Sequence, residues 1–442
     1  MAYRDEAHVF DGEGRTVSAE TRQTLPDDIS PNEFTEVLST LSSIPRSDQR
    51  RWGELYVRGL LAVRGKKTMR ALANGAGSAA EQSLYQFISK SPWDVDPVRG
   101  DLARLLIERA QPRAWVVQPL VITKVGQHSV GVERQWVSRL GRVVNCQQAM
   151  SVWLAGDQGS CPVDWQLALP ECWTDQDMRR RASIPTHVGS CPPEQCAVDS
   201  VSKMSREWGL RGRPVVMDLR DTAPLAVCTD LVARRIPFVV RVDPASITPM
   251  PPAGPADSAQ GWVGSAGLLT ALHKQRMPVE WFDHAARIMR ATSVGAARVA
   301  LRTGTAAHGR PEHLDLVLLA AWADPGRRSP SEFWLSNLAQ SQPVPQQAMC
   351  APPQTLPATT LGTVYRTAML ARRVERDLAE VSDGLGIRDF EGRSYRGWHH
   401  HMTMVSLAHA VRVLSPSRAH PPLPPPGRVT LAPSRAARVS AV

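Results

Sequence analysis

The chain has 442 residues, more than one simple core accommodates, so two or three domains are expected. Its 52 Lys and Arg against 42 Asp and Glu give a formal net charge of +10, which favours a polyanionic partner, nucleic acid before acidic lipid. Seven cysteines without a CxxC pair argue against a disulfide scaffold, and the polar N-terminus argues against a signal peptide. No apolar run approaches the roughly 20 residues of a membrane span. We therefore expect a cytoplasmic protein without a membrane partner.

The first hundred residues predict a disordered start followed by helices. Residues 1–30 are polar and acidic, and residues 31–110 carry helical patterns. The stretch "KKTMRALANGAGSAAEQSLYQFISKSPW" predicts a short helix, a glycine-containing turn and a second helix from Ser78, an arrangement similar to a helix-turn-helix with basic flanks at Lys66, Lys67 and Arg70. The alternative is an αα-hairpin that only packs against its neighbours.

Residues 111–243 predict an α/β domain. "AWVVQPLVI" reads as a buried strand despite Pro119, and "HSVGVERQWV" and "RVVNCQQAMSVWLA" follow as two more strands of a meander. A helical stretch then leads into "RPVVMDL", a short strand with Asp218 near its end, and a helix and the strand "IPFVVRV" follow. An acid at the carboxyl end of a strand is a common catalytic placement, but Asp218 could equally cap the next helix or pair with Arg220.

The remainder predicts an insertion, two helices and a tail. Residues 244–345 are expected to form an inserted, partly β region, 346–414 a linker and two helices of the core, and 415–442 a disordered, basic, Pro-rich tail. His399, His400 and His401 stand on the last helix, where consecutive residues point about 100° apart, so the three cannot hold one ion together. "CPPEQC" lacks a second pair of zinc ligands, and an unrelated metal-dependent hydrolase has little support beyond the histidines.

The order of several segments resembles one family, the DDE transposases of bacterial insertion sequences, in their cut-and-paste, RNase H-like, SRSO-type group. The resemblance runs from about Tyr56 to Leu414, and its sharpest motif is "FEGRSYRGWHHH". The segments that carry it are "SLYQFISKSPWDVDPVR", "HSVGVERQW", "GSCPVDWQLALPECW", "FWLSNL" and "GLGIRDFEGRSYRGWHHHMTMVSLAHA". It implies an N-terminal helical DNA-binding region, an RNase H-like catalytic core and a partly β insertion between the second and third acids.

In such enzymes three carboxylates hold two Mg²⁺ (or Mn²⁺) ions about 4 Å apart for DNA cleavage and strand transfer. By the resemblance, the second acid falls on Asp218 and the third on Glu375, which we expect to be catalytic and metal-binding. The first acid is missing, because Gln118 and Pro119 stand where the family carries an acidic segment. A lost carboxylate weakens a metal pair, since anionic ligands offset the repulsion between the ions.

Positions around the third acid also depart from the family. Its Tyr, Arg and Lys companions, which are expected to contact DNA phosphates, fall on Ala368, Ala371 and Ser382. Arg372 and Arg373 could partly substitute for the arginine. Further along, Arg393 and Arg396 are the best phosphate candidates, with Trp398 expected to be buried.

These observations favour a DNA-binding transposase-like protein with a degenerate active site. Its expected partner is double-stranded DNA at element ends, with a homodimer on DNA left open, and its expected place is the nucleoid. If the protein is active it uses Mg²⁺ or Mn²⁺, and otherwise it uses no cofactor. Two alternatives stay open: a domesticated transposase that regulates DNA sites, and an active transposase in which Glu133 on a neighbouring strand replaces the first acid.

Overall fold

The computed structural model describes residues 9–10, 16–17, 24–74, 76–247, 264–303, 313–324, 326–338 and 357–415. Most of the predicted disordered start, the predicted linker and the predicted tail lie outside these residues. Near the start, Val9–Phe10 (β1) pairs antiparallel with Thr16–Val17 (β2). No helix within the described ranges combines the length and apolar character needed to cross a bilayer.

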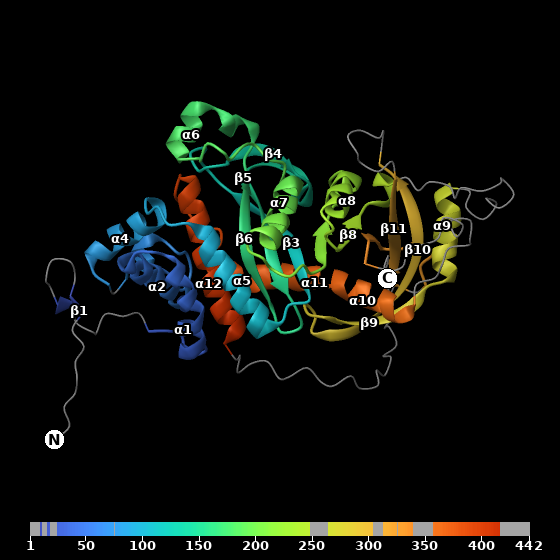
Figure 1. Ribbon diagram of the computed structural model, residues 1–442, viewed down its shortest axis with the longest axis horizontal. Helices are drawn as coiled ribbons and strands as arrows, with labels where there is room; N and C mark the ends of the chain where they lie inside the picture. The colour runs from blue at the N-terminus through green and yellow to red at the C-terminus, as the bar shows by residue number, and fades with distance from the viewer. Residues whose placement is uncertain are drawn as a thin grey trace, which may run out of the picture.

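The segment after residue 30 forms a group of helices at one end of the molecule (Figure 1). The predicted helix pair is present as α3 and α4. Thr68 begins α3 by accepting a hydrogen bond from the Ala71 backbone N–H, and Gly77, with a φ of +87°, allows the sharp entry into α4. The helices are α1 (Pro31–Ser39), η2 (Thr40–Ser43), α2 (Ser47–Ala62), α3 (Met69–Leu72), α4 (Ser78–Ser89) and α5 (Val95–Ala110).

The described strands from β3 onward form one ten-stranded mixed sheet in the order β4-β5-β3-β7-β8-β12-β11-β10-β9, with β6 also paired to β5. β7 is parallel to β3 and β8, whereas the other neighbours are antiparallel. The strands are β3 (Ala114–Thr123), β4 (Glu133–Val137), β5 (Arg142–Ala155), β6 (Ser160–Ala168), β7 (Val215–Asp218), β8 (Phe238–Val242), β9 (Met277–Asp283), β10 (Ile288–Arg302), β11 (His313–Trp322) and β12 (Glu332–Ser336).

The predicted meander of three strands is wrong in two respects. β4 does not lie beside β3, because β5 stands between them and pairs with both. The sequence reading also missed β6, whose Pro162 argues against a strand interior. The sheet accommodates this proline beside a register shift between Val152 and Trp153 on β5, where Pro162 lies opposite Trp153.

Pro119 is compatible with a central strand for a geometric reason. The Trp115 backbone N–H donates to the Pro214 carbonyl, so on β3 the N–H groups at odd positions point toward the β7 side. β7 is paired with β3 only at Trp115 and Val116. The N–H that Pro119 lacks would therefore point to a side where no ladder partner is present.

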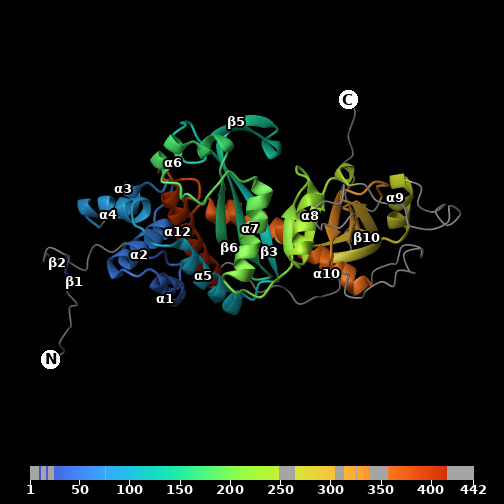
Figure 2. The same ribbon diagram turned by 45° about the horizontal axis from the view of Figure 1, so that its top comes forward.

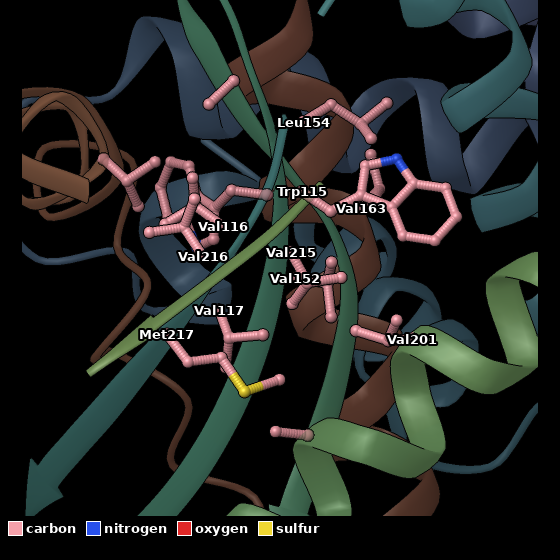
Figure 3. Packing of buried hydrophobic residues seen from close by; sticks show 14 of the residues in the cluster. Trp115, Val116, Val117, Val152, Leu154, Val163, Val201, Val215, Val216 and Met217 are labelled. Carbon is pink, nitrogen blue, oxygen red and sulfur yellow. The ribbon is translucent and has the colours of Figure 1, made fainter. Parts of the chain in front are cut away.

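Helices cover both faces of the sheet, with α7 in front and α11 behind in the view of Figure 1. Figure 3 shows the apolar side chains of the strands, with Val117 beside Met217 and with Val201 of α7 on the side nearer Val152. The remaining helices are η3 (Ser138–Leu140), η4 (Glu171–Thr174), α6 (Gln176–Ala182), α7 (Pro193–Arg206), α8 (Pro224–Ala233), η5 (Pro244–Ser246), α9 (Gly264–Lys274), α10 (Ala358–Ala368), α11 (Leu370–Asp377), the π-helical turn η8 (Leu378–Ser382) and α12 (Tyr395–Leu414).

The long helix α12 is buried on every side between residues 397 and 411. It packs against β6 of the sheet and against α1, α2, α4 and α5, so it joins the N-terminal helices to the core (Figures 1 and 2). A helix without a polar face is a core helix in a chain of this size.

The described strands of the predicted insertion extend the core sheet. β12 pairs antiparallel with β8, and β11, β10 and β9 follow outward. α9 packs against β10 at this far end (Figure 1). The pairing of β12 with β8 brings Glu332, at the start of β12, close to the end of β7.

Candidate active site

A pocket opens where β3, β7, β8 and β12 meet the helices α10 and α11. The strands contribute their polar side chains here because their apolar residues are used in the core. The lining residues are Val117, Gln118, Pro119, Arg139, Met217, Asp218, Arg220, Asp221, Arg241, Glu332, Trp334, Ala368, Met369, Ala371, Arg372 and Glu375.

All three positions that the family resemblance singles out line this pocket. β3 and β7 pair in parallel at Trp115–Val215 and Val116–Val216, and Gln118 and Asp218 each follow two residues further along their strands and line the pocket. Glu375 reaches the pocket from α11. Gln118 is buried, and its backbone carbonyl accepts a hydrogen bond from the Ser151 hydroxyl at 2.7 Å.

Both remaining acids are held by arginines. Arg220 binds Asp218 through two nitrogens, Nε to Oδ1 at 2.9 Å and Nη2 to Oδ2 at 2.6 Å. Burial acts to raise the pKa of Asp218, but Arg220 and then Arg241 outweigh it, so the pKa lies below its ordinary value. Glu375, with its side chain 49% exposed, accepts from Arg139 at 2.8 Å. The alternative pairing of Asp218 with Arg220 is thus what the structure contains.

Glu332 is a further carboxylate of the pocket that was not predicted from the sequence. Glu332 is 8% exposed and accepts from Arg241 at 3.0 Å and from Arg372 at 2.8 Å. Both arginines also lie over tryptophan rings, Arg241 over Trp334 and Arg372 over Trp281. The available signal was a charged residue at the head of "EFWLS", an otherwise apolar strand, because a buried charge requires a partner.

The pocket does not fit a pair of divalent cations as it stands. Arg139, Arg220, Arg241 and Arg372 balance the four carboxylates Asp218, Asp221, Glu332 and Glu375 in charge. Gln118 adds no charge, and two dications would have to displace arginines from carboxylates that they already occupy. Within the described ranges, no group of three or more His, Cys, Asp or Glu side chains is arranged to hold a metal ion.

Of the three positions that accompany the third acid in the resemblance, two line the pocket and one lies in the interior. Ala368 and Ala371, which stand where the resemblance places two DNA-contacting residues, line the pocket. Ser382 does not, because it is fully buried in the π-helical turn and its hydroxyl lies 2.8 Å from Nδ1 of His409. Ser382 therefore has a structural contact in place of a contact with DNA.

Of the two arginines beside Glu375, only Arg372 reaches the pocket. Arg373 is buried, donates to the Asp157 carbonyl at 3.0 Å, and lies 2.6 Å from His284 Nδ1. The expectation that Arg373 contacts DNA is wrong for this arrangement, because its guanidinium faces the interior.

The basic residues of the helical region differ in exposure. Arg70 is exposed, and Lys66 is exposed and ion-paired with Glu391. Lys67 is buried, where its amine donates to the Val63 carbonyl and its backbone N–H to Asp389, and burial lowers the pKa of its amine. Lys67 therefore does not present its amine to a DNA phosphate in this arrangement.

Within "DFEGRSYRGWHHH", the structure separates surface from core. Arg393 and Arg396 are exposed, and Trp398 is fully buried, as expected.

The three histidines are all buried, and each contacts a neighbouring segment. His399 lies against Arg99, His400 against the carbonyls of Ile88 and Trp93, and His401 against Tyr56 and Gly386.

Glu133 lies away from the pocket. It stands on β4, opposite Cys146 of β5, and interacts with Cys172. The assumption that its strand neighbours β3 is wrong, because β5 separates the two. This geometry removes the basis for Glu133 as a substitute acid.

Comparison with known proteins gives two matches. The family described as DDE superfamily endonuclease matches residues 39–307, well over half of the chain, a range that includes Gln118 and Asp218 and ends before Glu332 and Glu375. A curated protein, "Probable transposase for insertion sequence element IS701" from Microchaete diplosiphon, is 27% identical over 90 residues. That match covers 20% of this chain and 24% of the relative's length, so the chain spans about a quarter of the relative.

Proposed function

The chain belongs to the DDE superfamily endonuclease family, and from this premise we propose that it is a DNA-binding, transposase-like protein of a bacterial insertion sequence whose nuclease reaction is impaired. The observation that carries the proposal is the convergence of Gln118, Asp218 and Glu375 on one pocket. The pocket holds the second and third acids of the family, but a glutamine stands in place of the first carboxylate.

An RNase H-like core is part of the proposal. Its support is the arrangement of strands, in which β6, β5 and β3 run antiparallel, β7 and β8 follow in parallel, and helices cover both faces. In this arrangement a short strand places Asp218 at the carboxyl end of the sheet, where reacting groups are commonly found.

The arginines of the pocket support impairment and DNA binding together. Each arginine that neutralises a carboxylate removes negative charge that a metal pair needs. The same guanidinium groups match the geometry of phosphate oxygens. For a DNA phosphate to bind here, an arginine has to exchange its carboxylate for the phosphate, and the partly exposed Arg139, Arg220 and Arg372 are accessible for this exchange.

The net charge of +10 supports double-stranded DNA as the partner, in the cytoplasm and at the nucleoid. Exposed Arg70, Arg393 and Arg396 are proposed contacts. Whether the protein moves its own element or regulates DNA sites is decided by the flanking DNA, since terminal inverted repeats mark a mobile element.

The test is a cleavage and strand-transfer assay on the inverted repeats that flank the coding region, with Mg²⁺ or Mn²⁺, together with a gel-shift on the same fragments. We expect binding that weakens steeply with salt and no cleavage. Cleavage abolished by Asp218→Asn would refute impairment, and salt-independent binding or none would refute DNA binding. Gln118→Asp with Pro119→Asp serves as the comparison that returns acids to the first position.

A further inference from the structure

The hairpin that joins β4 to β5 exposes apolar side chains at its tip. Trp136 is 59% exposed, Leu140 47% and Val143 50%. Trp136 lies directly opposite Val143 in the ladder, so the two share one face of the hairpin. Large apolar side chains grouped on a surface mark contact sites more often than isolated ones do.

The same tip is strongly basic. Residues 134–143 read "RQWVSRLGRV", with three arginines and no acid. Arg134 stands two residues before Trp136 on the same strand and therefore on the same face. Arg142 is exposed at the tip, but it stands opposite Val137 and therefore belongs to the other face of the hairpin. The combination of an exposed indole with guanidinium groups is the chemistry that proteins use to stack bases and hold the adjoining phosphates.

The hairpin is held in position beside the pocket. Gly141 adopts a φ of +61° that closes the turn, and Val137 is buried beneath the tip. Arg139, three residues beyond Trp136, lines the pocket and is ion-paired with Glu375. A strand of DNA whose phosphate lies in the pocket would therefore pass next to the exposed face of the hairpin.

We propose that this face, made by Arg134, Trp136 and Val143 with Leu140 and Arg142 at the tip beside it, binds unpaired bases of DNA beside the pocket, with Trp136 stacking on a base. The inference rests on the proposed function, because it requires DNA in the pocket. Nucleic acid is favoured over a protein partner or a second copy of the chain, because Arg134 and Arg142 at this tip repel a copy of themselves and complement phosphates, whereas Arg139 is already paired with Glu375.

The experiment compares two otherwise identical 30-mer duplexes, one blunt and one with unpaired terminal bases, by fluorescence anisotropy in EDTA. The full-length protein is tested beside Trp136→Ala, Trp136→Phe and the matched control Ile288→Ala. Ile288 is similarly exposed, at 48%, on the β9–β10 hairpin at the far end of the sheet. Trp136 is exposed, so its replacement is expected to leave the melting temperature unchanged.

The unmodified protein is expected to bind the unpaired end more tightly than the blunt end. Trp136→Ala should lose roughly 5- to 100-fold in affinity for the unpaired end, the range for one stacked base. Trp136→Phe and Ile288→Ala should retain most of the affinity. Equal binding by Trp136→Ala and the unmodified protein would overturn the inference and leave the proposed function standing.

Two other results also overturn it. Loss of self-association in Trp136→Ala with unchanged DNA affinity would identify the hairpin as a contact between copies. Absence of binding to either duplex by the unmodified protein would overturn both the inference and the proposed function.

Discussion

Lowering the pH from 7.5 to 5.0 should destabilise the fold through its buried histidines, and His409 provides the clearest case. Its Nε2–H donates to the Ser160 carbonyl at 2.8 Å, and its Nδ1 lies 2.8 Å from the Ser382 hydroxyl, so the neutral ring satisfies both contacts. Burial lowers the pKa of His409 from 6.5 to about 4. Asp377 opposes this shift but does not cancel it.

The direction follows from proton binding. Between pH 6.5 and about 4 the unfolded chain holds a proton on His409 that the folded chain does not. The free energy of unfolding therefore decreases as the pH falls through this window. The loss of unfolding free energy that His409 causes is about 2 kcal/mol at pH 5.0 and close to zero at pH 7.5. His401, held between Tyr56 and Gly386 and with its pKa also lowered to about 4, acts in the same direction.

Urea unfolding followed by tryptophan fluorescence at both pH values measures the effect. His409→Gln keeps an N–H donor and an oxygen acceptor but cannot take up the proton. We expect the variant to lose about 2 kcal/mol less than the unmodified protein when the pH falls to 5.0. An identical loss in both proteins would refute the assignment of a buried, neutral His409.

Three further changes test the pocket and the core. Arg372→Gln should weaken binding of a DNA duplex by several-fold in a gel-shift at low salt. Arg373→Gln should lower the melting temperature but leave the DNA affinity of the folded protein unchanged. The reverse pattern would contradict the placement of Arg372 in the pocket and of Arg373 in the interior. Glu332→Gln should cost about 1–3 kcal/mol of unfolding free energy in urea and tighten DNA binding, because two partly exposed arginines lose a shared anion; weaker DNA binding would count against this reading. Asp164→Asn should cost about 3–5 kcal/mol in the same unfolding assay, because it leaves buried Arg99 without its charge partner at 2.8 Å, and a change below about 1 kcal/mol would show that this pair is not buried as described.

The elements that could be predicted from sequence are those with a strong local pattern. The helix pair around the glycine turn, the strand that ends at Asp218 and the long helix through Trp398 follow from apolar spacing and turn residues. β6 is not predicted because a proline within a strand is a local signal against pairing, whereas the register shift beside Pro162, which leaves Val163 without a ladder partner, is set by the pairing of β6 with β5.

The site was predictable in part for a related reason. Asp218, Glu375 and the departure at Gln118 were identified by resemblance, and all three line the pocket. Glu332 and Arg241 come from strands that meet only through the pairing of β8 with β12, which no local pattern specifies. The burial of Lys67 and Arg373 likewise depends on distant partners, since a basic residue in sequence does not reveal which way its side chain faces.

The position of α12 has a practical consequence for dividing the protein into parts. The helices of residues 31–110 pack around a helix that lies some 300 residues later in the chain, and Tyr56 and Arg99 bind directly to it. A fragment that ends before the sheet would expose the apolar surface that α12 covers. The helices of residues 31–110 and α12 therefore depend on each other for burial of their apolar surfaces, and this packing is complete only when synthesis of the chain has reached Leu414.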